Sequence, residues 1–228
     1  MLALNNPRRC APPATPKPSR RRRMILASGV ALLTLAGCKI DSRYEVFLTD
    51  VVDVANDAAK TVDLNAAFRI EMPTVKDCNE NKGKIVDVIG KYYALTAPPE
   101  CQKEGFNTFL TFKAKSPLVN AGARELPNNA VAGMAVKKGQ DGAAILHAVL
   151  DKRRFASLQA EMKSINSSGS VEIDDIVIDL NNDGKETYRI TGAAAFVNSE
   201  PKLITDLTVE RRAKFEIRPS NVTTAELV

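Results

Sequence analysis

The segment at residues 179–184 has the composition of a cation-binding loop. Its sequence Asp-Leu-Asn-Asn-Asp-Gly places oxygen ligands at Asp179, Asn181 and Asp183, before a glycine that permits a sharp turn. An EF-hand would also need a bidentate glutamate at the twelfth position, which is Ile190 here, and helical flanks, whereas these flanks alternate as strands. Asp-Gly is also a strong hairpin signal. We therefore expect a plain hairpin, with a weak calcium site as the alternative and no other cofactor.

Other residue patterns that support catalysis are weak. His147 is the single histidine and lies in an apolar run, so we interpret it as a core residue and not as a general base. The sequence contains no phosphate-binding loop, zinc-protease motif or nucleophile-elbow motif. We interpret adjacent carboxylates such as Asp174 and Asp175 as solvated surface residues and not as a catalytic pair. We therefore expect a protein that is not an enzyme.

The positive charge of the chain is concentrated at its N-terminus. Residues 1–37 carry seven basic and no acidic residues; without them, 25 basic residues face 27 acidic ones, a net charge of −2. A mildly acidic domain repels phosphate backbones, which excludes nucleic acid as a partner. The arginines at 20–23 precede an apolar stretch at residues 24–36, which is too short to span a bilayer comfortably. This order of segments is typical of a secretory signal peptide.

The apolar stretch ends in Leu35-Ala36-Gly37-Cys38. This ending resembles the lipobox of bacterial lipoproteins. The resemblance implies cleavage between Gly37 and Cys38, a diacylglyceryl thioether on Cys38 and acylation of its amine, with palmitate as a typical acyl group. Such chains would hold the protein on a lipid bilayer. Because Lys39, and not aspartate, follows the cysteine, the same resemblance favours the outer over the inner membrane. An ordinary signal peptide is the alternative.

Two further cysteines are suited to a disulfide bond. Cys78 and Cys101 remain once Cys10 and Cys38 are assigned to the leader and the anchor. An exported chain enters an oxidising compartment, where an even pair of cysteines favours a bridge. A redox or metal pair is the alternative, but it lacks both C-x-x-C spacing and companion histidines.

The 191 residues from Cys38 onward are suited to one domain. We expect a signal peptide at 1–37, the lipidated cysteine and a short tether at 38–43, and a single domain at 44–228. Alternation predicts strands at 62–72, 106–114, 131–136, 143–150, 171–180, 187–196 and 203–217. A capping box at Thr74 and Asp77 predicts one helix, residues 155–165 a second, and residues 166–170 a turn.

The first residues of the domain leave two alternatives open. Residues 44–59 fit either one helix, or a strand to residue 48 followed by a shorter helix that Thr49 caps. Strands, interspersed helices and turn signals together predict an α+β fold with a mainly antiparallel sheet and two or three amphipathic helices.

A second resemblance covers much of the mature chain. The segment Ser42-Arg43-Tyr44-Glu45-Val46, the Cys78…Cys101 pair and the Asn182-Asp183 turn resemble uncharacterised lipoproteins encoded by phages and prophages. The resemblance implies a role in altering the host envelope or excluding competing phage, and it carries over no functional residue.

The sequence therefore predicts a membrane-anchored, non-enzymatic binding module with an envelope protein as partner. A carrier or assembly factor for an apolar ligand is the first alternative, and it requires a cavity between sheet and helices. An envelope hydrolase is the second, and it requires a pocket with convergent carboxylates or an activated serine.

Overall fold

The computed structural model describes residues 38–138, 144–165, 171–192, 195–202 and 205–220. The leader with Gly37 and the turn expected at residues 166–170 lie outside these ranges. Within them, no helix has the length and hydrophobicity needed to cross a membrane.

The first strand starts at Cys38. In β1 (Cys38–Phe47), Ser42, Tyr44 and Val46 are buried while Arg43 between them is exposed, which is the period-two pattern of a strand with one face on the core. The helix α1 (Leu48–Asn56) follows directly, so the strand-then-helix alternative is correct, although Phe47 and not Thr49 is its N-cap. Residues 38–43, which we expected to form a tether, are therefore part of a paired strand.

The next segments form as their local patterns predict. The strand β2 (Val62–Met72) buries alternate residues, and Thr74 caps α2 (Val75–Ile89) by accepting a hydrogen bond from the backbone N–H of Asp77. The predicted cap at Thr74 is thereby confirmed, and the Asp77 carboxylate accepts a hydrogen bond from the Thr74 hydroxyl at 2.6 Å, not from its backbone N–H. Tyr92 and Tyr93 lie just beyond the end of this helix. After α2 the chain forms β3 (Ala94–Leu95), β4 (Glu100–Glu104) and β5 (Asn107–Asn120).

The second half begins with a short 3-10 turn, η1 (Pro127–Asn129). Three elements then follow: β6 (Ala132–Lys138), β7 (Ala144–Leu150) and α3 (Lys152–Ile165). The remaining elements are strands, namely β8 (Val171–Asn181), β9 (Tyr188–Gly192), β10 (Ala195–Val197), β11 (Glu200–Lys202), β12 (Thr205–Val209) and β13 (Lys214–Pro219).

The single strand expected over residues 203–217 is wrong. A turn with Arg212 at a φ of 65° separates β12 from β13. The backbone of Asn182 holds this turn, because its N–H donates to the carbonyl of Ala213 and its carbonyl accepts from the N–H of Arg212. The strand β12 then pairs with β9 in a separate two-stranded sheet, whereas β13 pairs with β8.

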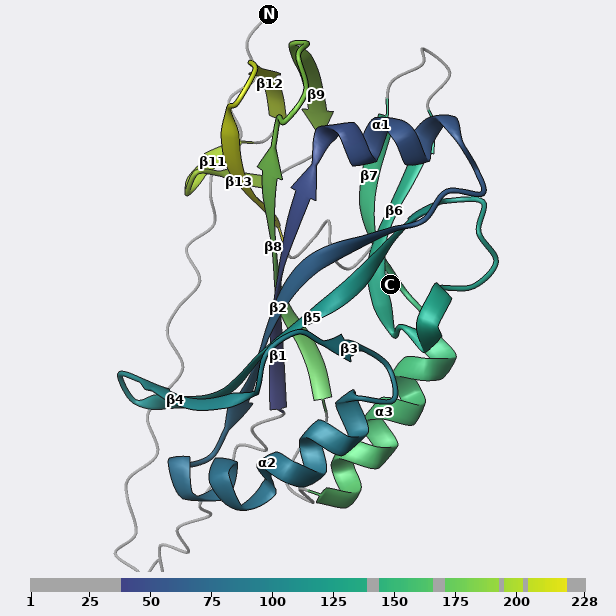
Figure 1. Cartoon of the computed structure of the whole chain (residues 1–228). Coiled ribbons are helices and arrows are strands. Elements are labelled where there is room, and N and C mark those ends of the chain that lie inside the picture. Colours follow the sequence, from purple (N-terminus) through teal and green to yellow (C-terminus); the bar gives the residue numbers. More distant parts are fainter. Residues whose placement is uncertain (1–37, 139–143, 166–170, 193–194, 203–204, 221–228) are drawn as a thin grey trace, which may run out of the picture. The chain divides into compact units, whose positions relative to one another are not determined.

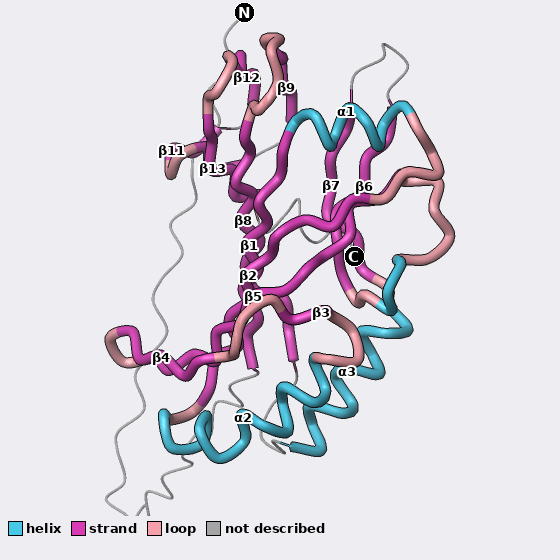
Figure 2. Tube along the Cα trace, in the orientation of Figure 1, coloured by secondary structure: helices cyan, strands magenta, loops and turns pink. Residues whose placement is uncertain are grey.

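The expected α+β fold with a mainly antiparallel sheet is also wrong, because the described residues are mostly β-strand and the large sheet is mixed. The strand order is β11-β10-β13-β8-β1-β2-β5-β6-β7, with β3 and β4 also pairing with β5 (Figure 2). Near its middle β1 runs parallel to β8, from Cys38 opposite Val171 to Phe47 opposite Asn181, and β5 runs parallel to β6. Turn signals predict only antiparallel neighbours. The strands β1 and β8 come from distant parts of the sequence, and a connection that contains η1, not a tight turn, joins β5 to β6.

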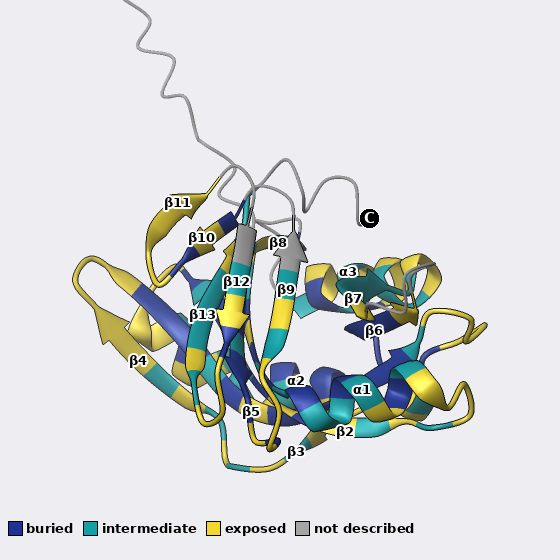
Figure 3. Cartoon of the chain, turned by 90° about the horizontal axis from the view of Figure 1, so that it is seen from above, coloured by how far each residue is buried: buried dark blue, intermediate teal, exposed yellow. Residues whose placement is uncertain are grey.

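The large sheet is curled. The helices α2 and α3 lie side by side on its inner face, in the lower part of the view (Figure 1). Burial is concentrated between this face and α2 and α3, while β4 and the β10–β11 hairpin are largely exposed (Figure 3). The helix α1 covers the far end of the sheet, against β5, β6 and β7.

Candidate apolar ligand site

A cavity of about 340 Å³ lies between the inner face of the sheet and the helices α2 and α3. This volume is within the range of small-molecule sites, about 300–1,000 Å³. Most lining side chains are aliphatic or aromatic. The lining residues are Ile40, Ser42, Tyr44, Phe68, Ile70, Ile89, Tyr92, Tyr93, Phe112, Val131, Ala132, Gly133, Ala148, Val149, Leu150, Phe155, Leu158, Met162, Ile173, Asp174 and Ile176.

One wall of the cavity is aromatic. Phe68 of β2 stacks on Phe112 of β5 with ring centroids 5.1 Å apart, and it contacts Tyr93 at 5.0 Å. Tyr44 of β1 packs on Phe68 in a T-shaped arrangement, with ring centroids 6.1 Å apart. Because β1, β2 and β5 are adjacent strands, alternate residues of each bring these rings to one face of the sheet.

The buried hydroxyl groups of this wall already have partners. The Tyr93 hydroxyl accepts a hydrogen bond from the N–H of Ala132 at 2.8 Å and donates to the carbonyl of the same residue at 3.3 Å. Burial raises the pKa of Tyr44 to about 12, and burial together with the neighbouring Tyr44 raises the pKa of Tyr93. Both phenols are therefore protonated at neutral pH, and the wall is uncharged.

Glycine at position 133 allows two strands to approach closely beside the cavity. A Cβ atom on Gly133 would lie 2.5 Å from the carbonyl oxygen of Pro117 in β5, which is closer than real contacts allow. The Ser116 hydroxyl donates to the carbonyl of Ala132 at 3.1 Å and holds the start of β6 in the same place.

The two helices that cover the cavity are tied to each other and to the sheet. Glu161 of α3 forms an ion pair with Lys91 and accepts a hydrogen bond from the Tyr92 hydroxyl at 2.9 Å, contacts that lower the pKa of the carboxyl group. Gln159 donates to the carbonyl of Val171 at 2.7 Å, which fixes α3 against the start of β8. These contacts keep the helices in place without filling the space beneath them.

The cavity wall reaches the surface at the starts of β1 and β8. Ile40 and Ile173 are half-buried, and Asp174 beside them is exposed. The Asp174 carboxylate forms an ion pair with Lys39 at 3.1 Å, and hydrogen bonding to this carboxylate raises the pKa of Lys39. The only charged group among the lining residues thus lies at the rim, beside the residue that follows Cys38.

The size of the cavity has an energetic consequence. Because the cavity reaches the surface at its rim, the cost of a sealed and empty space of this volume, about 8 kcal/mol at about 24 cal/mol per Å³, is an upper bound. This upper bound is comparable with the whole stability of an ordinary domain, about 5–15 kcal/mol. Apolar walls also hold water poorly. If one methylene group fills roughly the 30 Å³ of a water molecule, the space suits about ten of them.

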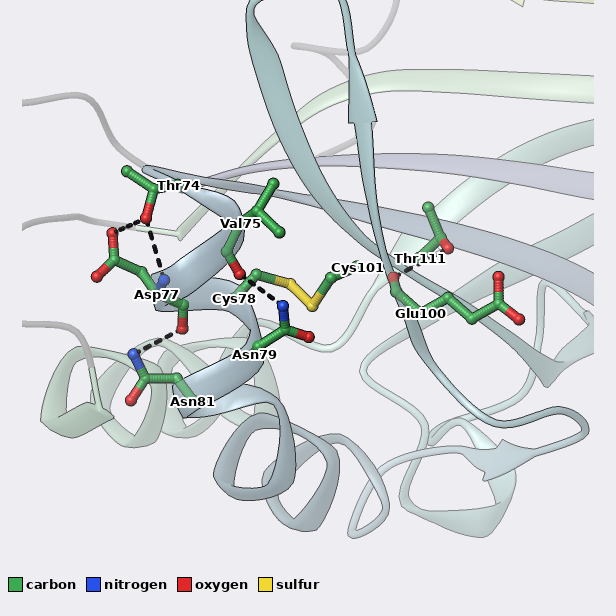
Figure 4. The surroundings of a disulfide bond; sticks show 9 residues. All are labelled: Thr74, Val75, Asp77, Cys78, Asn79, Asn81, Glu100, Cys101 and Thr111. Carbon is green, nitrogen blue, oxygen red and sulfur yellow. Dashed lines mark hydrogen bonds between the residues drawn. A yellow bond between two sulfur atoms is a disulfide. The ribbon is translucent and has the colours of Figure 1, made fainter.

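The predicted disulfide is confirmed. Cys78 of α2 and Cys101 of β4 are bonded, with their Cα atoms 6.0 Å apart (Figure 4). Cys78 lies one turn after the helix start that Thr74 caps, and it is completely buried. The bridge connects the helix that covers the cavity to the hairpin formed by β4 and β5.

The three residues proposed as calcium ligands have other partners. Asp179 receives two hydrogen bonds from the Arg43 guanidinium, at 2.5 and 2.6 Å. Asn181 is buried, and its amide donates to the carbonyl of Asp179 at 3.3 Å. Asp183 accepts hydrogen bonds from the N–H and the hydroxyl of Thr49. In the described part of the chain, no group of three or more His, Cys, Asp or Glu side chains is arranged to hold a metal ion.

The Asp183-Gly184 turn does not form the expected hairpin, because β8 and β9 belong to different sheets. Its polar groups bind distant backbone instead. Asp183 supplies the side-chain cap that Phe47 cannot give to α1. Burial opposes its ionisation, but the hydrogen bonds from Thr49 outweigh this effect and lower the pKa of Asp183. The buried Asn182 amide donates to the carbonyls of Glu186, Val209 and Glu210.

His147 lies half-buried on β7, next to the lining residue Ala148. Burial lowers its pKa, and the neighbouring Lys137 adds to this effect.

Sequence reasoning did not identify the cavity itself. Periodicity placed many of its residues on buried faces, but it contains no signal that distinguishes a filled core from one that leaves space.

A family model described as a domain of unknown function (DUF7424) matches residues 41–228. No curated protein and no solved structure matches the sequence. The matched region starts within β1 and contains all the later elements.

Proposed function

The chain belongs to the DUF7424 family, and we propose that it is a non-enzymatic, lipid-anchored protein of the bacterial envelope that binds a ligand with a hydrocarbon chain. The observation that carries this proposal is the apolar cavity of about 340 Å³ beneath α2 and α3. Anchoring through acylated Cys38 is supported by the order of the leader segments, and outer-membrane sorting by Lys39. This ligand-binding function replaces protein docking as the leading hypothesis, since the described part of the domain has an apolar cavity of suitable size between the sheet and the helices α2 and α3.

The polar groups of the cavity support binding over catalysis. Asp174 is the single carboxylate among the lining residues, and it is paired with Lys39. Ser42 donates its hydroxyl hydrogen to the carbonyl of Asp175 at 3.4 Å and has no imidazole partner to activate it. A hydrolase would need convergent acids or an activated nucleophile at this site.

Filling the cavity tests the proposal. Ala148→Phe, in a chain that starts at residue 38 and carries Cys38→Ser, should occupy the space of three or four methylene groups. At about 0.8 kcal/mol per methylene group, the loss is about 2–3 kcal/mol, or roughly 30- to 150-fold in Kd. Binding is measured by the fluorescence of a dansyl-labelled undecanoic acid.

Ala144→Phe is the matched control, because Ala144 is an exposed residue of the same strand and does not line the cavity. It should bind the probe like the parent chain. Equal affinities of the two variants, or the absence of saturable binding to the parent, would refute the proposal.

One observation favours a second candidate function, docking of an envelope protein and thereby modification of the host envelope. Within the described residues β7 pairs with β6 alone, so its outer edge is available to a strand from a partner. Ile145 on this edge is 51 % exposed. A pull-down from solubilised envelope should recover a partner with the parent chain and lose it with Ile145→Asp; a partner retained by that variant argues against docking at β7.

A further inference from the structure

The tip of the β4–β5 hairpin exposes an aromatic side chain that packs on nothing. Glu104 pairs with Asn107, so Gly105 and Phe106 form a two-residue turn, with Gly105 at a φ of 61°. Phe106 is fully exposed. A single exposed hydrophobic residue is ordinary on a protein surface, so its meaning depends on what surrounds it.

The surroundings hold the tip away from the core. The Cys78–Cys101 bridge ties β4 to α2. The Arg69 guanidinium lies 4.0 Å from the centre of the Phe109 ring and pairs with Glu104 at 3.0 Å. The disulfide holds the hairpin near its base and the Arg69–Glu104 ion pair holds it next to the turn, so these contacts oppose folding of Phe106 back onto the domain.

A second exposed apolar side chain belongs to the same braced unit. Val75, the first residue of α2, is 38 % exposed and lies one turn before Cys78. Among the described residues, the other large hydrophobic side chains with high exposure are Ile145 and Phe196, on β7 and β10. Two of the four, Val75 and Phe106, therefore belong to α2 and to the β4–β5 hairpin, which the disulfide joins.

Strand registers place this unit at the end of the sheet where β1 begins. Ile40 of β1 lies opposite Ile70 of β2. Two residues further along β2, Met72 lies opposite Thr108, which is next to the turn-closing Asn107 at the tip of the hairpin. Cys38 is likewise two residues before Ile40. With adjacent strands about 4.8 Å apart, Cys38 and Thr108 are separated by about 10 Å across the sheet.

We propose that the Gly105–Phe106 tip, together with Val75, is a second membrane contact that inserts into the lipid leaflet anchoring Cys38. The inference rests on the proposed acylation of Cys38. Lys76 directly follows Val75, and Lys103 lies three residues before Phe106; both lysines are exposed, as suits a surface with anionic lipid. Lys76 also reaches Glu80 at 3.8 Å, and the nearby Glu104 is paired with Arg69.

Contact at two points has a consequence for the cavity. Acyl chains on one cysteine leave the domain free to rotate about its anchor, whereas a second contact restricts that rotation. The rim at Ile40 and Asp174 belongs to the same end of the sheet as Cys38. A domain held in this way keeps the rim beside the bilayer, where hydrocarbon chains are available.

The chain contains no tryptophan, so one substitution creates a unique reporter. Phe106→Trp is prepared in the full lipidated protein and reconstituted into vesicles of phosphatidylethanolamine and phosphatidylglycerol. Ile145→Trp is the matched control, because Ile145 is also exposed but lies at the opposite end of the sheet. It pairs with Lys137 of β6, the residue after Val136, which lies opposite Asn120 at the end of β5 away from the hairpin.

Indole emission from the Phe106→Trp protein should shift to shorter wavelength in the vesicles and be quenched by lipids brominated on their acyl chains. Emission from the Ile145→Trp protein should show neither effect. If incorporation of labelled fatty acid proves that Cys38 is acylated and the two proteins still behave alike, the second contact is refuted while the anchor stands. If no fatty acid is incorporated, the proposed anchor fails, and the inference fails with it.

Discussion

Reduction of the Cys78–Cys101 bond should destabilise the domain by about 3 kcal/mol. The two cysteines are 23 positions apart, and the chain-entropy relation for a closed loop of this length gives about 3 kcal/mol at 25 °C. Reduction keeps both sulfur atoms in place, so it removes the restraint on the unfolded chain without opening a void around the buried Cys78. For a domain of this size the midpoint of thermal unfolding should fall by about 6–12 °C.

Circular dichroism of the chain from residue 38 with Cys38→Ser, heated with and without reductant, measures this shift. Cys78 and Cys101 are then the only cysteines left, so free-thiol titration reports the bond directly. The double variant Cys78→Ala/Cys101→Ala is the control and should unfold at the same temperature in both conditions. An unchanged midpoint in the parent chain, with two free thiols measured, would refute the entropic account.

Two further predictions concern titration and helix capping. His147, the single histidine, should show a pKa below 6.5 in a proton NMR titration, because burial disfavours its charged form. The unfolded chain then binds this proton at a higher pH than the folded chain does. The contribution of neutral His147 to the free energy of unfolding is therefore complete above pH 6.5 and is lost as the pH falls through the pKa of the folded state. A measured pKa at or above 6.5 would contradict this, and His147→Gln should remove that part of the pH dependence. Asp183→Asn should lower stability at pH 7 by about 1 kcal/mol in urea unfolding, because it weakens the cap on α1. Since the pKa of Asp183 is lowered in the folded state, the difference in unfolding free energy between variant and parent should shrink as the pH falls through that pKa. Asp63→Asn, at an exposed position, is the control. Equal effects of the two variants on stability would exclude capping by Asp183.

Features that depend on neighbouring residues were predictable from the sequence. Thr74 caps α2 through a residue three positions away, and β2 alternates because each residue faces either the core or solvent. The disulfide was predicted by elimination, because Cys78 and Cys101 are the two cysteines that remain once Cys10 and Cys38 are assigned to the leader and the anchor. In each case a short-range pattern or a simple elimination contains the whole physical reason.

Features that depend on remote partners were not predictable. Asp183 is typical of a hairpin or a cation loop in its own segment, yet it caps a helix 134 residues earlier in the chain. The alternation over residues 203–217 continues through a point where the backbone of Asn182 imposes a turn. The parallel pairing of β1 with β8 joins segments with no shared local signal.

The sequence by itself determined the cap at Thr74, the bridge between Cys78 and Cys101 and the buried faces of individual strands such as β2. These follow from hydrophobicity, residue type and cysteine number, which are properties that the chain carries before it folds. Only the tertiary structure decided the mixed sheet, the partners of the acidic turn and the cavity beneath α2 and α3. A void exists only where surfaces from separate elements fail to meet, and no single segment contains that information.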